Sequence, residues 1–193
     1  VRDDALKALA RPFLGCLEGT AVVGAADLRG ELLRLVCDDG DDVLLPCLIE
    51  VVRAGAKLDA PVREATGLDA VAEHCIRLVE ARLARPARRA EDWSIELPGG
   101  CDCGLCGTLG TFLADADERT LEWPLATDGR RHVHSRIDAG ELPVRHQTRR
   151  SGRPYTLVLT KTTALFQLEE KQRRRDETDL RWLESRLGRA GGG

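Results

Sequence analysis

Three closely spaced cysteines, followed by three histidines, are the residues of this chain most suited to chemistry. They are Cys101, Cys103, Cys106, His132, His134 and His146. Thiolate sulfur and imidazole nitrogen are preferred ligands of Zn²⁺, which takes four of them in structural sites. The two residues between Cys103 and Cys106 favour a tight knuckle whose backbone amides point at the sulfurs, and Cys101 would share one side of an extended strand with Cys103. The pattern predicts one Zn²⁺ held by the cysteines and an imidazole.

The sequence leaves the fourth ligand open. If Gly129 to Asp138 is helical, His132 and His134 point to nearly opposite faces, so only one of them binds. We favour His134, because on a helix it falls near the apolar side with Ile137, whereas His132 stands among arginines. His146, in an expected strand, is the reserve candidate.

The cysteines allow two other interpretations, since Cys-x-x-Cys pairs also occur in redox proteins and as ordinary buried thiols. No βαβ pattern surrounds the motif, which disfavours a thioredoxin-like site. Three neighbouring cysteines are also too few for an all-thiolate iron–sulfur cluster. Buried free thiols remain the main competitor of zinc.

The composition of the chain indicates what class of protein it is. The 193 residues are 42% hydrophobic and 32% charged, which is ordinary for a globular chain. There is no run of about eighteen apolar residues and no basic-then-apolar leader, so we expect neither membrane insertion nor secretion. Seven cysteines, an odd number, indicate a reducing and therefore cytoplasmic location. The absence of methionine and the start at Val1 suggest a fragment of a longer protein.

The elements that must position the cysteines form the second of two sequence regions. Residues 1–90 have apolar residues at spacings of three and four, which predicts four or so packed helices, with helical repeats as one possible origin. We expect N-caps at Asp27 and Asp42, helix ends at Gly40 and Gly55, and a last helix over Leu68–Arg85. We expect four cysteines in the core, Cys16, Cys37, Cys47 and Cys75. His74 lies beside the apolar side of the last helix, and we expect it to be partly buried and not catalytic.

Residues 91–188 are expected to form a small α+β domain, followed by a flexible tail at 189–193. A short strand over Trp93–Leu97 leads into the knuckle, a helix follows it, and Leu121–Leu125 is a second strand. Val144–Arg149 and Tyr155–Thr162 alternate as a β-hairpin does. A final helix from Thr163 to Leu187 has a polar middle that we expect to be exposed. The predicted fold class is α+β, with a helical N-terminal half, a β-hairpin and a Cys/His metal knuckle.

Basic residues concentrate near the hairpin. Between Gly129 and Arg175 there are twelve Lys and Arg against four Asp and Glu. A row of Arg145, Arg149, Arg150 and Arg153 could follow a phosphate backbone, which favours, as the alternative function, a zinc-dependent module that binds nucleic acid or protein. Aromatic residues make up only 4% of the chain, so stacking on single strands is not favoured.

Motifs of the common catalytic sites are missing from the sequence. There is no Gly-rich phosphate loop, no Gly-x-Ser-x-Gly and no His-Glu-x-x-His. His132-Val133-His134 lacks the acidic residue that an iron-binding facial triad would place third. We therefore assign no catalytic residue, and the sequence leaves open whether the chain is part of an enzyme.

Several motifs in order carry a family resemblance. They are Cys101-Asp-Cys-Gly-Leu-Cys106, Phe112-Leu-Ala-Asp115, Arg131-His-Val-His134 and Thr148-Arg-Arg-Ser-Gly-Arg-Pro-Tyr-Thr-Leu-Val-Leu-Thr-Lys-Thr162. Over roughly residues 70–183 the chain resembles the C-terminal region of large prolyl 4-hydroxylase-like proteins, the 2-oxoglutarate- and Fe(II)-dependent oxygenases. The resemblance implies a non-catalytic, zinc-stabilised accessory module, structural or substrate-recruiting. Its partner would be an oxygenase domain of the same polypeptide, which alone would bind Fe(II) and 2-oxoglutarate.

Overall fold

The computed structural model describes residues 2–37 and 42–188 and divides into two compact units. Unit 1 consists of Val1–Pro86 together with Arg173–Gly193, and unit 2 of Ala87–Gln172. The first boundary falls close to the predicted residue 90. The end of the final helix, which the sequence interpretation assigned to the second domain, belongs to unit 1 instead. Gly40 and the tail predicted at 189–193 lie outside the described residues.

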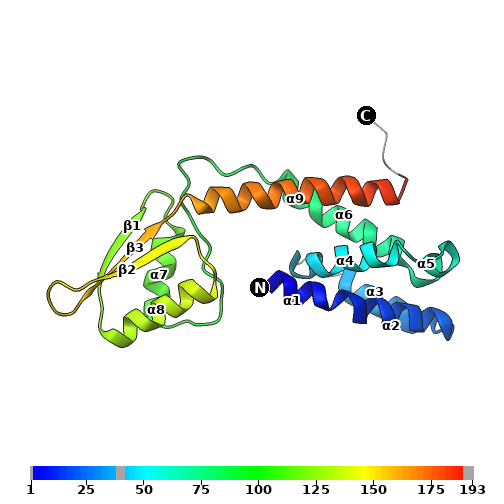
Figure 1. Ribbon diagram of the computed structural model, residues 1–193, viewed down its shortest axis with the longest axis horizontal. Helices are drawn as coiled ribbons and strands as arrows, with labels where there is room; N and C mark the ends of the chain where they lie inside the picture. Colours follow the sequence, from blue (N-terminus) through cyan, green and yellow to red (C-terminus); the bar gives the residue numbers. More distant parts are fainter. Residues whose placement is uncertain (1, 38–41, 189–193) are drawn as a thin grey trace. The chain divides into compact units, whose positions relative to one another are not determined.

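Unit 1 is helical throughout its described part (Figure 1). Its elements are α1 (Arg2–Ala8), α2 (Ala10–Val22), α3 (Ala26–Cys37), the 3₁₀ turn η1 (Asp42–Leu44), α4 (Leu45–Gly55), α5 (Ala60–Thr66), α6 (Leu68–Ala84) and the C-terminal part of α9 (Ala164–Arg186). The chain is thus cut into more and shorter helices than the four or so expected. The predicted helix over Leu68–Arg85 is confirmed as α6.

Helices α4 and α6 form the centre of unit 1. Leu48 and Val52 of α4 pack against Val71 and Val79 of α6, and Leu183 of α9 joins the same cluster with no exposed surface. Each such side chain contributes about 1.5–3 kcal/mol on burial. The last helical turns therefore complete a core that begins more than a hundred residues earlier in the sequence.

Gly55 ends α4 where the sequence predicted. A Cβ at this position would lie 2.2 Å from Cδ1 of Leu68, the first residue of α6. A larger residue would therefore force the side chain of Leu68, which is buried, to move. The glycine lets Leu68 pack directly against the end of α4.

The two predicted N-caps are wrong. Helix α3 begins at Ala26, one residue before Asp27, because Gly24 turns the chain with a φ of +70°. Helix α4 takes Leu44 as its N-cap, since Asp42 has already begun the 3₁₀ turn. Each aspartate instead stands in the first turn of its element, where a negative charge favours the helix dipole.

The predicted core residues of unit 1 are confirmed in part. His74, Cys47 and Cys75 are buried, and burial raises the pKa of the Cys75 thiol to about 12. Cys37 is only half-buried. Cys16 is exposed, because the buried residues of α2 lie on a different face of the helix. Its placement in the core was wrong.

The polar middle of α9 was expected to be exposed, but part of it is buried. Asp176 is 5% exposed and forms an ion pair with Arg82 of α6. The distance between Asp176 Oδ2 and Arg82 Nε is 3.2 Å. One turn later Asp179 pairs with Arg53 of α4 at 2.5 Å. The acidic residues of this stretch thus attach α9 to both central helices of unit 1.

Unit 2 contains a three-stranded antiparallel sheet with the order β1–β3–β2 (Figure 1). The strands are β1 (Thr120–Pro124), β2 (Val144–Arg149) and β3 (Thr156–Lys161). The predicted hairpin is confirmed as β2 and β3, whose register pairs Val144 with Lys161 and Arg149 with Thr156. Pro124 ends an edge strand, a position that tolerates the missing N–H group.

Helices α7 (Gly104–Ala114) and α8 (Thr127–Ala139) share a core with the sheet. Leu109 of α7 and Val133 of α8 are buried together with Leu157 and Leu159, the residues of β3 that point to this side. The α+β class predicted for this half of the chain is confirmed. The segment that carries the cysteines runs from Ile95 to α7, and both are part of this core.

The predicted strand Trp93–Leu97 is wrong. Its backbone is extended, yet it joins no ladder, because Ile95 N–H donates to Leu113 O and Trp93 N–H donates to Ala116 O. These carbonyls belong to the end of α7 and the residues just after it. The segment's apolar alternation serves to bury Ile95 rather than to extend the sheet.

A buried lysine also binds the end of α7. Lys161, the last residue of β3, is 1% exposed, and its ammonium donates to Leu113 O at 3.1 Å and to Asp115 O. Nζ stands 4.8 Å from the centre of the Phe112 ring. Burial lowers the pKa of Lys161 below its ordinary value. The charge compensates carbonyls that a helix end leaves without intrahelical donors.

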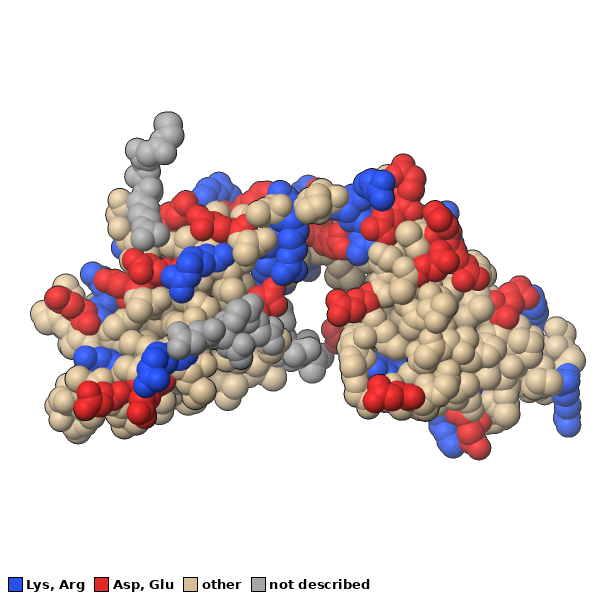
Figure 2. Space-filling model, turned by 180° about the vertical axis from the view of Figure 1, so that it is seen from behind, with Lys and Arg blue, Asp and Glu red and all other residues tan. Residues whose placement is uncertain are grey.

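Arginines of the hairpin lie where the sequence placed them. Arg145 and Arg149 are on the exposed side of β2, and Arg150 and Arg153 are exposed in the turn. Arg149 is already bound, because its guanidinium makes two contacts with the Glu122 carboxylate of β1. On the face shown in Figure 2, unit 2 has a large uncharged area, and its basic side chains do not gather into one patch.

Candidate metal centre

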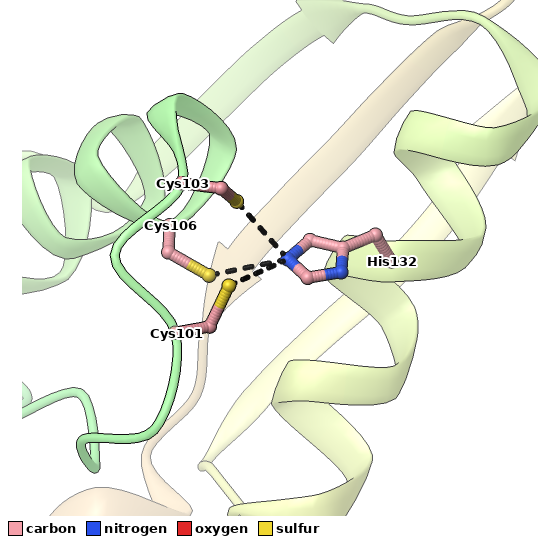
Figure 3. Close-up of side chains that lie close together, drawn as sticks. All are labelled: Cys101, Cys103, Cys106 and His132. Carbon is pink, nitrogen blue, oxygen red and sulfur yellow. Dashed lines mark hydrogen bonds between the residues drawn. The ribbon is translucent and has the colours of Figure 1, made fainter.

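Three cysteine sulfurs and one imidazole nitrogen converge at the start of α7 (Figure 3). The ligand atoms of Cys101, Cys103, Cys106 and His132 all lie within 4.8 Å of one another. Nε2 of His132 is 3.2 Å from the sulfur of Cys106, 3.4 Å from that of Cys103 and 3.9 Å from that of Cys101. Tetrahedral zinc with ordinary bond lengths sets sulfur and nitrogen about 3.5 Å apart. The nitrogen–sulfur distances are therefore close to those of a tetrahedral zinc site.

The local fold of the knuckle explains why the sulfurs meet. Cys103 is the N-cap of α7 with extended dihedrals, φ −71° and ψ 160°, and Cys106 lies in the first helical turn. Gly107 N–H donates to Cys103 O at 3.0 Å and closes that turn. Gly100, immediately before Cys101, has a φ of +116°, which L-residues rarely adopt. The chain thus reverses over a few residues and brings three thiols to one side.

The electrostatics of the knuckle favour thiolate at one position and oppose it at another. The amides of Cys106 and Leu105 and the Cys101 thiol lower the pKa of Cys103 to about 6, with the Cys106 amide as the largest cause. Burial, followed by the two neighbouring cysteines, raises the pKa of Cys106 to about 11. Three sulfurs this close cannot all ionise unless a cation compensates them. A bound metal ion would supply that charge.

Helix α8 holds the loop as well as supplying the ligand. Arg136 stands one turn after His132 on α8, and its guanidinium donates to Pro98 O and, at 3.1 Å, to Gly99 O. These carbonyls precede Cys101 by only a few residues. The helix therefore fixes both the imidazole and the approach of the loop. Arg136 was not expected to contribute to the site, although its spacing of four from His132 places it on the same helix face.

His134, the histidine favoured from the sequence, is not the one that meets the cysteines. That prediction was wrong because it assumed that the ligand lies on the apolar side of α8, whereas the cysteine loop covers the side that carries His132. His134 lies instead against His146 of β2, the reserve candidate, with ring centroids 4.4 Å apart. Burial, reinforced by His146, lowers the pKa of His134.

The Cys101–Cys103–Cys106–His132 cluster is the one group of three or more potential metal ligands found among residues 2–37 and 42–188. Over the same residues, no helix combines the length and the apolar composition needed to cross a membrane. Comparison of the chain with protein-family models, curated protein sequences and solved structures found no match. The resemblance to the C-terminal region of 2-oxoglutarate oxygenases stays a prediction.

Proposed function

We propose that Cys101, Cys103, Cys106 and His132 bind one Zn²⁺ in a closed structural site and that unit 2 is a non-catalytic, zinc-stabilised module. The observation that carries the proposal is the convergence of three sulfurs and one nitrogen within 4.8 Å. Four protein ligands fill a tetrahedral zinc ion and leave no position for water or substrate. Catalysis by this metal is therefore not part of the proposal.

Zinc is preferred over other metals because of the donor set. Three thiolates and an imidazole are soft and borderline ligands, which suit Zn²⁺ and exclude the oxygen-seeking Mg²⁺ and Ca²⁺. Zn²⁺ has no redox chemistry and accepts tetrahedral geometry without electronic preference. A structural role follows from these properties.

The metal would bind the cysteine loop to the two helices of unit 2 that lie beside it. The loop with Cys101, the first turn of α7 and the middle of α8 all meet at the cluster (Figure 3). Because such a site does not exist in the unfolded chain, the free energy of zinc binding becomes free energy of folding. Unit 2 should therefore depend on zinc for the order of this region.

The wider role that we propose is that of an accessory module, structural or substrate-recruiting, in a larger oxygenase-like polypeptide. The ordered motifs from Cys101 to Thr162 support this part of the proposal. Nucleic-acid binding through the hairpin is the less favoured alternative, since Arg149 is engaged by Glu122. In the accessory role, Fe(II) and 2-oxoglutarate would be bound outside this chain.

Metal analysis of the purified chain tests the zinc site. We expect one zinc per chain, with X-ray absorption showing three sulfurs and one nitrogen. Cys103→Ser should lose the metal and unprotect the amides around α7 in hydrogen exchange, while the amides of α4 and α6 stay protected. Cys16→Ser, which replaces an exposed cysteine of unit 1, is the matched control and should change neither readout. A metal content unaffected by Cys103→Ser would refute the proposal.

A further inference from the structure

A pair of histidines lies in unit 2, with ligand atoms that the Cys/His cluster does not use. His134 of α8 and His146 of β2 face each other at an angle of 65° between their ring planes. Their two Nδ1 atoms point at one another within hydrogen-bond reach. Two lone pairs, or two N–H groups, repel when they face each other, so a proton or a cation must stand between these nitrogens.

The elements of unit 2 bring the two rings together from different directions. His146 alternates along β2 with the exposed Arg145 and Gln147, so its ring is on the less exposed side of the strand. His134 follows His132 by two residues and therefore leaves α8 toward a different side. The side chain of His146 remains 24% exposed. A small ion can reach the pair from solvent.

Asp138 determines which nitrogen of His146 carries the proton. His146 Nε2–H donates to Asp138 Oδ1 at 3.0 Å, which leaves a lone pair on Nδ1 of the neutral ring, directed at His134. A carboxylate bound to the outer nitrogen in this way orients metal-bound histidines and raises their basicity. Asp138 lies one turn after His134 on α8, so one helix supplies a ligand and the orienting group.

We propose that His134 and His146 bind a divalent transition-metal ion through their Nδ1 atoms, with Asp138 as a positioning residue. Imidazole nitrogen suits Zn²⁺, Cu²⁺ and Ni²⁺. Two imidazoles on one tetrahedral zinc place their nitrogens about 3.3 Å apart, so the rings must rotate outward to admit the ion. Water completes the coordination, which makes this site open and weaker than the closed cysteine site. The inference does not depend on the metal at the cysteines.

Calorimetric titration of the zinc-loaded full chain with further Zn²⁺ tests the second site. We expect a second, weaker binding event that His134→Ala and His146→Ala abolish while the first equivalent of zinc is retained. Asp138→Ala should weaken the second event by about 10- to 100-fold. Asp128→Ala removes an exposed carboxylate of the same helix and should leave the affinity unchanged.

Histidine side-chain ¹H–¹⁵N spectra distinguish metal binding from a hydrogen bond between the rings. The second equivalent of zinc should move both Nδ1 resonances to metal-bound positions. His146→Gln serves where alanine disturbs the fold. No second event, an event that survives in the histidine variants, or unmoved Nδ1 resonances would each overturn the inference. If the cysteines bind no zinc, the histidine event becomes the first and is still lost in His146→Ala, so the two proposals fail separately.

Discussion

Replacing Lys161 with methionine tests how a buried charge stabilises unit 2. Methionine keeps most of the length and apolar volume of the lysine stem but has no N–H donor. In the native structure the ammonium bonds to Leu113 O and Asp115 O and stands 4.8 Å from the Phe112 ring centre. The substitution removes these three contacts and the cost of burying the charge at the same time.

The expected loss of stability depends on which hydrogen bonds the two carbonyls keep in the variant. Leu113 O keeps the Ile95 N–H, which donates to it at 2.7 Å, so this carbonyl stays satisfied. Asp115 O loses the ammonium, and a hydrogen bond to a charged group contributes about 1.5–3 kcal/mol, of which water recovers a part because Asp115 is exposed. The lost contact with the Phe112 ring adds about 0.5–2 kcal/mol. Relief from desolvation of the ammonium opposes both. We expect Lys161→Met to destabilise unit 2 by about 2 kcal/mol, which is less than the sum of the two losses because the relief of desolvation offsets part of them.

Hydrogen exchange of the zinc-loaded full chain measures this effect locally. A loss of about 2 kcal/mol accelerates exchange of the most protected amides of unit 2 roughly 30-fold, since each 1.4 kcal/mol is a factor of ten. The most protected amides of α4 and α6 should exchange as before. Lys171→Met, at an exposed position of α9 within unit 2, is the control and should have little effect.

The pH dependence provides a second readout of the same substitution. Because burial lowers the pKa of Lys161 below the 10.5 of an exposed lysine, the unfolded chain binds more protons than the folded chain between these two values. Wild-type stability should therefore rise with pH in that window, relative to Lys161→Met. Equal or greater stability of the variant at neutral pH would show that the desolvation cost outweighs the contacts of the ammonium and would refute our reasoning.

Three further predictions concern the cysteine loop, the contact of Gly55 with Leu68, and the removal of zinc. Arg136→Met should weaken zinc binding about 10- to 100-fold in a chelator competition, because it releases the loop before Cys101, whereas Arg131→Met, at an exposed surface pair, should not. Gly55→Ala should destabilise unit 1 by about 1–3 kcal/mol in denaturant unfolding; Gly30→Ala, with open space around it, should not destabilise it. Treatment with a strong zinc chelator should unprotect the amides of α7 and leave those of α4 protected; uniform protection in both would contradict a structural metal.

The sequence predicted the parts of the site that depend on short spacing. Cys103 and Cys106 are separated by two residues, and this local pattern suffices to form the knuckle. The choice between His132 and His134 was not local, because it depends on which side of α8 the cysteine loop covers. Helical periodicity identifies the apolar side of a helix and gives no information on a loop that arrives from elsewhere.

The same distinction holds for the fold. Alternation identified the hairpin, since β2 and β3 are neighbours in sequence and in the sheet. It failed for Trp93–Leu97, whose alternating residues have their hydrogen-bond partners at the end of α7. The sequence also did not predict that Lys161 and Asp176 are buried. The charge of each is compensated by a group distant in sequence, Leu113 O for Lys161 and Arg82 for Asp176. Tertiary partners decide such cases.

The two segments of unit 1 have a consequence for biosynthesis. A ribosome delivers Val1–Pro86 first, then all of Ala87–Gln172, and only afterwards the stretch with Leu183, which completes the core around α4 and α6. Unit 2 is thus an insertion, synthesised in full while unit 1 still lacks its last helical segment. If the proposed zinc site is correct, the cysteine knuckle can bind zinc on the nascent chain before unit 1 is complete, so the connectivity of the chain sets the order of the two steps.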